Sequence, residues 1–336
     1  MSRIKITDSS LRDGNHSVKH QFSIEDVKRV VKALDDAHID IIEVGHGDGL
    51  MGSTINYGFS KESDIDLVRA AASVAKNSKI AVLLIPGIGT IPDMKEAYDA
   101  GAEVVRVATH VTEADISMGH IQEAKNMGLF TVGFLMMAHR EPMERVVEEA
   151  KKMESYGADV VYVTDSAGAM LPGEVREKVS ALVKNLSIPV GHHSHNNLGL
   201  AIGNSLAALE AGATYLDGSL GGLGAGAGNT ATEMLVGVMD RSGYEKNADF
   251  FKTMDAATEV LKPIVEHYGV KLPAIQDPLM LGYAGVYSSF MLHAKRAEER
   301  FGVDYRKIIL EAGKRKAVGG QEDWLYEIAA ELAGKN

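Results

Sequence analysis

One stretch decides the fold, Ala100-Gly101-Ala102-Glu103-Val104-Val105-Arg106-Val107, because three variants of it recur along the chain. The variants occupy residues 37–44, 156–163 and 211–217. Each reads as the end of a helix, a glycine-type C-cap and then a buried parallel strand. The copies lie about 55 to 63 residues apart, roughly twice the strand-to-strand period of an eight-stranded barrel. The pattern therefore predicts that they are the even-numbered strands of such a barrel.

The odd-numbered strands are expected in the gaps, at residues 4–7, 80–85, 130–136 and 189–193. The intervals carry apolar residues at helical spacing, and Ser23 followed by acidic residues is typical of a helix N-terminus. Because strand and helix alternate through eight units, we predict an α/β fold, a TIM (β/α)8 barrel, over residues 1–245. A doubly wound open sheet is the alternative, but its glycine-rich fingerprint is missing after the first strand.

The last part of the chain, residues 246–336, lacks the strand pattern. Helical periodicity covers residues 248–268, 279–300 and 305–332, with Gly and Pro turns between them. We therefore expect a helical C-terminal region packed on the barrel, which makes the contact with a partner and is not a second catalytic unit.

Composition excludes several classes of partner and site. The chain carries 35 Lys and Arg against 46 Asp and Glu, a net charge of −11, without a basic cluster, so we expect no nucleic acid partner. No apolar run is long enough to span a membrane, and no signal region precedes the first strand. The absence of Cys leaves no disulfide and no thiol nucleophile. These features predict a cytoplasmic protein without membrane contact.

Polar residues able to do chemistry follow the first and seventh predicted strands, at the end of the barrel where active sites lie. Arg12, Asp13 and His16 follow the first strand, and His193 and His195 follow the seventh. Alternate residues of an extended segment face the same way, so the two histidines can hold one ion together. Asp13 would complete a set of two histidines and one carboxylate with open coordination positions. The plain alternative for the first loop is an ordinary Asp-Gly turn.

The ligand types narrow the ion without fixing the reaction. Nitrogen and oxygen ligands without sulfur suit Mn²⁺, Mg²⁺, Co²⁺ or Zn²⁺, and non-haem Fe(II) oxygenases use a similar set. No Lys ends a predicted strand, so a Schiff-base aldolase has no candidate amine. An ion beside Arg12 and His16 suits the stabilisation of an enolate while a neighbouring hydroxyl loses its proton. His192 should face away from the ion and be structural.

Other loops at the same end of the barrel offer weaker candidates. Ser166 can bind a carboxylate, although a helix-capping turn explains its position nearly as well. The glycine-rich residues 221–229 allow a ligand to approach the backbone, but their spacing matches no phosphate motif. His46, His110 and His139 follow other strands without independent support.

These motifs together resemble a known family. Leu11-Arg12-Asp13-Gly14 combined with His193-Ser194-His195-Asn196-Asn197 is similar to a superfamily of metal-dependent aldolases that includes isopropylmalate synthase, hydroxymethylglutaryl-CoA lyase and the 4-hydroxy-2-oxovalerate aldolases. His16, with residues 84–90, 224–229 and 283–290, resembles the last of these families over nearly the whole chain. His192 departs from the family, in which an apolar residue is more usual.

The resemblance implies a role for each candidate residue. Asp13, His193 and His195 would bind a divalent ion, Mn²⁺ in the family, with Mg²⁺ or Co²⁺ as alternatives. Arg12 would hold the 2-oxo acid and stabilise the pyruvate enolate. His16 would take the proton of the 4-hydroxyl group as the C3–C4 bond breaks.

The resemblance also implies the substrate contacts and the partner. Ser166 and Tyr283 would contact the substrate together with Arg12, Asp13 and His193, and Tyr287 is the alternative to Tyr283. The products would be pyruvate and a short aldehyde, usually acetaldehyde, late in the meta-cleavage catabolism of aromatic hydrocarbons. An acylating acetaldehyde dehydrogenase would receive the aldehyde through a channel. Two other functions stay open: an acyl-CoA Claisen-type condensing enzyme or lyase, and a silent scaffold for a dehydrogenase.

Overall fold

The computed structural model describes residues 3–272 and 276–334 of the chain, which form two compact units. Unit 1 is Met1–Leu272 and unit 2 is Pro273–Asn336. The boundary between the units thus lies beyond residue 245, where the sequence pattern placed the end of the barrel domain. The reason is that the helices directly after residue 245 pack on α1 (Ile24–Asp36) and α8 (Thr232–Arg241) of the barrel.

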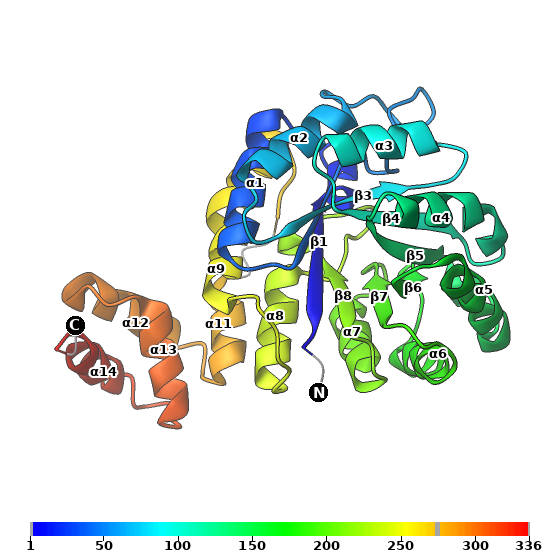
Figure 1. The fold of residues 1–336 in the computed structure, drawn as a ribbon. Coiled ribbons are helices and arrows are strands. Elements are labelled where there is room, and N and C mark those ends of the chain that lie inside the picture. Colours follow the sequence, from blue (N-terminus) through cyan, green and yellow to red (C-terminus); the bar gives the residue numbers. More distant parts are fainter. Residues whose placement is uncertain (1–2, 273–275, 335–336) are drawn as a thin grey trace. The chain divides into compact units, whose positions relative to one another are not determined.

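Unit 1 is a closed barrel of eight parallel strands in the order β1 to β8, which confirms the predicted TIM fold (Figure 1). β1 and β8 close the barrel, with Lys5 opposite Tyr215 and Thr7 opposite Asp217. The strands are β1 Lys5–Leu11, β2 Ile41–Val44, β3 Lys79–Leu84, β4 Val104–His110, β5 Phe130–Met136, β6 Val160–Asp165, β7 Val190–Ser194 and β8 Tyr215–Gly218.

Helices alternate with the strands and surround them (Figure 1). At the predicted N-cap, Asp26 N–H donates to the Ser23 hydroxyl while the Asp26 carboxylate accepts from Ser23 N–H, so a complete capping box starts α1. The helices are α1 Ile24–Asp36, α2 Asp64–Val74, α3 Ile91–Asp99, α4 Met118–Asn126, α5 Met143–Tyr156, α6 Pro172–Asn185, α7 Ala201–Glu210 and α8 Thr232–Arg241, and short 3-10 helices η1 Asp13–His16, η2 Ala114–Ser117, η3 Ala138–Arg140 and η4 Leu220–Gly222 follow β1, β4, β5 and β8.

Side chains fill the interior of the barrel. Ile41, Val104 and Val160 come from β2, β4 and β6 and are buried in one cluster with Leu83 and Phe134 of the odd-numbered strands. The first three occupy the same position of the sequence repeat. The repeat therefore generates one interior layer directly, because alternate strands of such a barrel supply each layer.

A further helical segment covers α1 after the last strand. It consists of α9 Phe250–Asp255, the π-helical η5 Ala256–Leu261 and α10 Lys262–His267. The N–H of Asp249 donates to the carbonyl of Ala37 at 2.9 Å, and the Tyr268 hydroxyl donates to Asp26 at 2.7 Å. These bonds fix the segment to the two ends of α1.

The described part of unit 2 consists of α11 Gln276–Ala284, α12 Phe290–Phe301, α13 Tyr305–Lys314 and α14 Trp324–Ala333. The prediction of continuous helices over residues 279–300 and 305–332 is wrong, because the chain turns at Gly285, Lys316 and Gly320, which have positive φ. That the tail packs on the barrel stays a prediction for unit 2. No helix within residues 3–272 and 276–334 is long and apolar enough to cross a membrane.

Candidate active site

The predicted metal ligands meet at the carboxyl ends of β1 and β7. Asp13 begins η1 directly after β1, and His193 and His195 lie at the end of β7 and just beyond it. The Asp13 Oδ2 atom lies 3.6 Å from His193 Nε2 and 3.5 Å from His195 Nε2. One ligand atom from each residue lies within 4.8 Å of the other two. The loops after β1 and β7 thus bring three atoms that could bind a metal ion close together.

Asp13 is held ionised by its surroundings. Burial opposes its ionisation, but the Arg12 guanidinium and the imidazoles of His195 and His193 outweigh burial and lower the pKa of Asp13. Its other oxygen, Oδ1, accepts from the N–H of Ala225 at 3.1 Å. Oδ2 is therefore the oxygen left facing the two histidines.

Each histidine is oriented by a neighbour. His193 Nδ1 lies 2.8 Å from the Asp217 carboxylate, which makes Nδ1 the protonated nitrogen and leaves the lone pair of Nε2 directed at Asp13. The His195 ring forms a hydrogen bond with the backbone of Ala225 in the glycine-rich loop, and the backbone of His195 forms a β-bridge with Asn229 of the same loop. Burial lowers the pKa of His195, so its imidazole is neutral and able to coordinate a cation at neutral pH.

This donor set fits a divalent ion. Two neutral imidazole nitrogens and one carboxylate oxygen are the mixed ligands that Mn²⁺, Co²⁺, Zn²⁺ and Fe(II) accept. The carboxylate supplies one negative charge, and Asp217 supports His193 as in other metal sites where a carboxylate holds a ligating histidine. Three protein ligands leave coordination positions for a substrate.

Arg12 lies beside the proposed metal ligands, and part of its guanidinium already bonds other groups of the protein. Its Nε donates to Glu43 at 2.8 Å, and its Nη1 donates to the carbonyl of Gly47 at 3.3 Å and lies 3.2 Å from Asp13. The hydrogen bonds described for Arg12 use Nε and Nη1 and leave out Nη2. This nitrogen is therefore the part of the guanidinium available to a bound oxo acid.

His16 ends η1, one turn after Asp13. Its ring lies edge-on to that of His20, 5.1 Å between centroids, and fills the space where a Cβ at residue 47 would lie, so only Gly fits there. His16 lies three residues after Asp13 in the same 3-10 helix, and a charged His16 ring would lower the pKa of Asp13.

A second group of three possible ligands, His16, His20 and Asp48, is the poorer cation site. The N–H of Gly47 donates to His20 Nδ1 at 3.3 Å, and the ring also bonds the backbone of Tyr57. Both ring nitrogens of His20 are thus engaged, whereas a coordinating imidazole needs a free lone pair.

The rings of His20 and His46 form a stacked pair beside the loop that follows β2. Their ring centroids lie 3.7 Å apart, and burial, with the neighbouring His46 and His16, lowers the pKa of His20 to about 4. His46 Nδ1 accepts from the N–H of Asp48 at 3.0 Å, and its Nε2 lies 3.0 Å from the Gly58 carbonyl. His46, a weak candidate in the sequence, thus organises the loop after β2.

The remaining candidates are placed as follows. The Ser166 hydroxyl accepts from the N–H of Met137 at 3.1 Å, which ties the loop after β6 to the loop after β5. His110 is exposed, with 61% of its side chain accessible, while His139 lies 4.0 Å from Asp165. Tyr283 belongs to α11 of unit 2, so its distance to the ligands is not defined.

His192 behaves as expected of a structural residue. It is fully buried, and its Nδ1 lies 3.0 Å from the Val163 carbonyl. Burial lowers its pKa to about 4. It packs behind the ligands and does not join them.

The sequence reasoning missed Glu43 and Asp217, the carboxylates that hold Arg12 and His193. Both lie inside predicted strands and not in the loops after them. The available signal was an acidic residue at a position where a buried strand is normally apolar.

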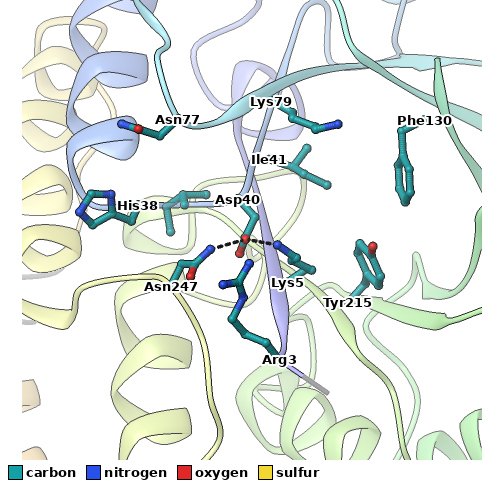
Figure 2. A pocket seen from close by; sticks show the side chains of 11 residues that line it. Arg3, Lys5, His38, Asp40, Ile41, Asn77, Lys79, Phe130, Tyr215 and Asn247 are labelled. Carbon is teal, nitrogen blue, oxygen red and sulfur yellow. Dashed lines mark hydrogen bonds and ion pairs between the residues drawn. The ribbon is translucent and has the colours of Figure 1, made fainter. Parts of the chain in front are cut away.

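A separate hollow of about 600 Å³ opens at the opposite end of the barrel (Figure 2). Asp40 at its centre accepts from Lys5 at 2.8 Å and from Asn247 at 2.9 Å, with Arg3 and Lys79 nearby. It lies at the amino ends of the strands, where side chains usually serve stability. Its size therefore does not make it the site of the chemistry.

Comparisons with known proteins identify the family of the chain. The HMGL-like family matches residues 3–260, and the DmpG-like communication domain matches residues 274–334. The 4-hydroxy-2-oxovalerate aldolase of Geobacillus thermodenitrificans is 57% identical over 332 residues, 99% of this chain and 96% of that protein. The protein of the same name from Carboxydothermus hydrogenoformans is 56% identical over 336 residues, 99% of this chain and 98% of the other.

A solved structure supports the fold alone. The HMG-CoA lyase of Bacillus subtilis superposes with a TM-score of 0.70 at 22% identity, over 82% of this chain and 96% of that chain. At this identity the likeness establishes the architecture and not the reaction.

Proposed function

The chain belongs to the HMGL-like family and, within it, to the 4-hydroxy-2-oxovalerate aldolases, and from this premise we propose that it cleaves 4-hydroxy-2-oxopentanoate and similar 4-hydroxy-2-oxo acids to pyruvate and a short aldehyde, acetaldehyde in the first case. Membership makes it a carbon–carbon lyase. The observation that carries the proposal is the convergence of Asp13, His193 and His195 beside Arg12 and His16.

The chemistry needs charge stabilisation and one proton acceptor. A divalent ion, when bound, supplies positive charge next to the 2-oxo group. Arg12 adds a second positive charge, and its free Nη2 is the donor for the developing enolate oxygen or for the carboxylate. Both charges act where negative charge grows as the bond breaks.

His16 completes the reaction as the base. Its imidazole accepts the 4-hydroxyl proton, and the C3–C4 bond breaks. The electron pair of that bond stays with C3 and forms the enolate of pyruvate. The former C4 hydroxyl becomes the carbonyl of the aldehyde, and the enolate then takes up a proton at C3. An imidazole suits this role because its ordinary pKa lies near neutral pH.

Two finer assignments complete the proposal. The ion is Mn²⁺, which the resemblance to the aldolase family implies, with Mg²⁺ or Co²⁺ as substitutes, and a ligand set of two nitrogens and a hard oxygen is compatible with it. Unit 2 contacts an acylating acetaldehyde dehydrogenase, which the match of residues 274–334 to a communication domain supports. The aldehyde then passes to that enzyme without release to the solvent.

The test is pyruvate release from 4-hydroxy-2-oxo acids of increasing length, measured with lactate dehydrogenase and NADH. The purified chain is treated with chelator and then supplied with Mn²⁺, Mg²⁺ or Co²⁺. We expect cleavage that requires the added ion and is strongest with Mn²⁺. Pyruvate formation unaffected by chelator would reject the metal assignment, and no pyruvate with any ion would favour the scaffold alternative. Release of free CoA from an acyl-CoA with a 2-oxo acid would favour the Claisen alternative.

A further inference from the structure

One position of the sequence repeat supplies four polar side chains to a single interior layer of the barrel. They are Glu43 on β2, Arg106 on β4, Tyr162 on β6 and Asp217 on β8, here called the charged layer. All four are buried, with at most 2% of any of them exposed. The charged layer lies two residues nearer the active-site end of the strands than the apolar layer that contains Ile41.

Arg106 is the centre of the charged layer. Its Nη1 donates to Glu43 Oε2 at 3.0 Å and its Nη2 donates to Asp217 Oδ2. The guanidinium also lies over the rings of Phe134 and Tyr162, at 4.4 Å and 4.8 Å from their centroids. One side chain thus bridges carboxylates on β2 and β8 across the barrel.

The same two carboxylate oxygens also bond residues of the candidate active site. Glu43 Oε2 also accepts from Arg12 Nε at 2.8 Å, and Asp217 Oδ2 lies 2.8 Å from His193 Nδ1. A continuous chain of charge-assisted bonds therefore runs from the substrate-binding guanidinium to a metal ligand, with Arg106 at its midpoint.

Stability alone does not account for this arrangement. Interior layers of such barrels are usually built from Val, Ile and Leu. Buried ion pairs often stabilise a fold no better than apolar side chains of similar volume, because both charges lose their hydration. Here both ends of the buried network bond residues of the candidate active site. The charged side chains can therefore orient those residues, which an apolar layer could not do.

We propose that Arg106 is a positioning residue for both halves of the site. Through Asp217 it fixes the ring of His193 so that Nε2 faces the ion, and through Glu43 it fixes the Arg12 guanidinium so that Nη2 faces the oxo acid. The proposal rests on the proposed function for the identity of the ion and the substrate, but not for the network itself.

The network predicts that its two branches fail separately. Asp217→Asn should weaken Mn²⁺ binding by about 10–100-fold, the usual effect of losing a carboxylate behind a ligating histidine. Glu43→Gln should leave Mn²⁺ binding within about twofold of wild type and lower kcat/KM at saturating Mn²⁺, because it loosens Arg12 alone. Arg106→Met should show both defects.

Arg106→Lys is the decisive variant. A lysine keeps the charge, but its three N–H donors all lie on one nitrogen, so it cannot reproduce the spacing of the two guanidinium nitrogens that bond Glu43 and Asp217 and should hold one carboxylate better than the other. We expect it to recover the fold and one of the two properties lost in Arg106→Met. Arg176→Met, which removes an exposed arginine paired with Glu210 at 2.7 Å, is the matched control and should change neither property.

The measurements are Mn²⁺ titration of the full chain by calorimetry and electron paramagnetic resonance, and steady-state cleavage at saturating Mn²⁺. Circular dichroism checks the fold; if Arg106→Met does not fold, the Lys, Asn and Gln variants decide. Wild-type Mn²⁺ affinity in both Asp217→Asn and Arg106→Lys, with unchanged kinetics, would overturn the role of Arg106 while leaving the proposed function intact. Equal loss of Mn²⁺ affinity in Glu43→Gln and Asp217→Asn would overturn the two-branch arrangement. If the wild-type chain bound no divalent ion, the proposed function and the His193 branch would fail together.

Discussion

At the scale of single residues, Asp13 shows how position sets chemistry. It lies in the first turn of η1, directly after β1, where the Arg12 guanidinium lies 3.2 Å from its Oδ2 atom and the Nε2 atoms of His193 and His195 lie 3.6 Å and 3.5 Å from the same atom. A buried carboxylate is costly unless such partners hold it, and an ion would complete the set. Its neighbours therefore favour an ionised ligand over a protonated acid.

Replacing Asp13 should remove the ion. Asp13→Asn deletes the charged ligand between the two histidines, and we expect at least a 100-fold loss of Mn²⁺ affinity, because a neutral amide is a much weaker ligand. Elemental analysis of the purified protein checks this directly. Asp48→Asn is the matched control, since Asp48 belongs to the second group of possible ligands. Metal lost from the Asp48 variant and kept by the Asp13 variant would move the ion to the second group.

Replacing His16 should separate proton transfer from metal binding. His16→Ala removes the proposed base, and we expect cleavage of 4-hydroxy-2-oxopentanoate to fall about 10²–10⁴-fold. Mn²⁺ affinity should stay at the wild-type level, and so should deuterium exchange into the pyruvate methyl group, which needs no 4-hydroxyl proton. His110→Ala, at an exposed histidine, is the control. Wild-type cleavage by His16→Ala would show that another group is the base.

The residues predictable from the sequence were those in loops at strand ends. Asp13, His193 and His195 could be predicted to lie close together because they end or follow the first and seventh predicted strands, whose carboxyl ends meet at one end of a barrel. Glu43 and Asp217 could not, since they sit within strands, and periodicity does not show which interior position faces a partner across the barrel. Only the closed barrel brings β2, β4 and β8 into contact through Arg106.

At the scale of elements, the glycine-rich loop after β8 is part of the site. Its Ala225 N–H bonds Asp13, its Asn229 pairs with His195, and its Gly224 carbonyl accepts from Ser17 at 2.9 Å. The sequence pattern suggested close approach of backbone to a ligand. The structure shows backbone approaching the side chains that are the proposed metal ligands, which no phosphate motif would have indicated.

A single methyl group should disturb this loop. Gly228 has a φ of 87°, and a Cβ there would overlap the carbonyl oxygen of Gly222. We expect Gly228→Ala to weaken Mn²⁺ binding by about 10-fold or more, since the loop holds Asp13 and His195. Gly87→Ala is the control, because Gly87 has a similar φ of 97° but nothing within 4 Å of its Cβ position. Equal Mn²⁺ affinities of the two variants would show that this loop does not influence metal binding.

The same loop rests on a buried acid whose protonation should be visible in stability. Glu233 of α8 accepts from the N–H of Gly221 at 3.1 Å, and burial raises its pKa from 4.5 to about 7. Between about pH 4.5 and 7 the folded chain holds a proton that the unfolded chain has released, so stability falls as pH rises. Glu233→Gln should flatten this dependence by roughly 1–3 kcal/mol, measured by urea unfolding at pH 5 and 7.5 with chelator. An unchanged slope would mean that Glu233 titrates normally.

Strands were easier to predict than the tail helices for a physical reason. A buried strand is marked by a short apolar run between turns. In addition, the four copies of the repeat showed where four of the eight strands lie in the sequence. In the tail, apolar residues keep helical spacing across Gly285 and across the turn at Lys316. Periodicity alone cannot place a break where the next helix continues the same pattern.

At the scale of the whole molecule, the chain divides its tasks between two units. Unit 1 holds every proposed metal ligand, the proposed base His16 and Arg12. Unit 2 matches a communication domain and carries Tyr283 and Tyr287. If the active site uses a residue of unit 2, aldol cleavage depends on both units, whereas Mn²⁺ binding depends on unit 1 alone.

Two tyrosine variants test this division. Tyr283 is half-buried on α11, whereas Tyr287 lies beyond its end, 60% exposed, with its ring 6.5 Å from that of Phe290. Tyr283→Phe should lower kcat/KM for the hydroxy acid about 10- to 100-fold, the effect of losing one hydrogen bond to a charged group, and leave Mn²⁺ affinity unchanged. Tyr287→Phe should change neither quantity. The reverse result would assign the substrate contact to Tyr287, and two neutral variants would confine the chemistry to unit 1. Because both substitutions keep the ring, a change in kcat/KM reports the hydroxyl and not the packing.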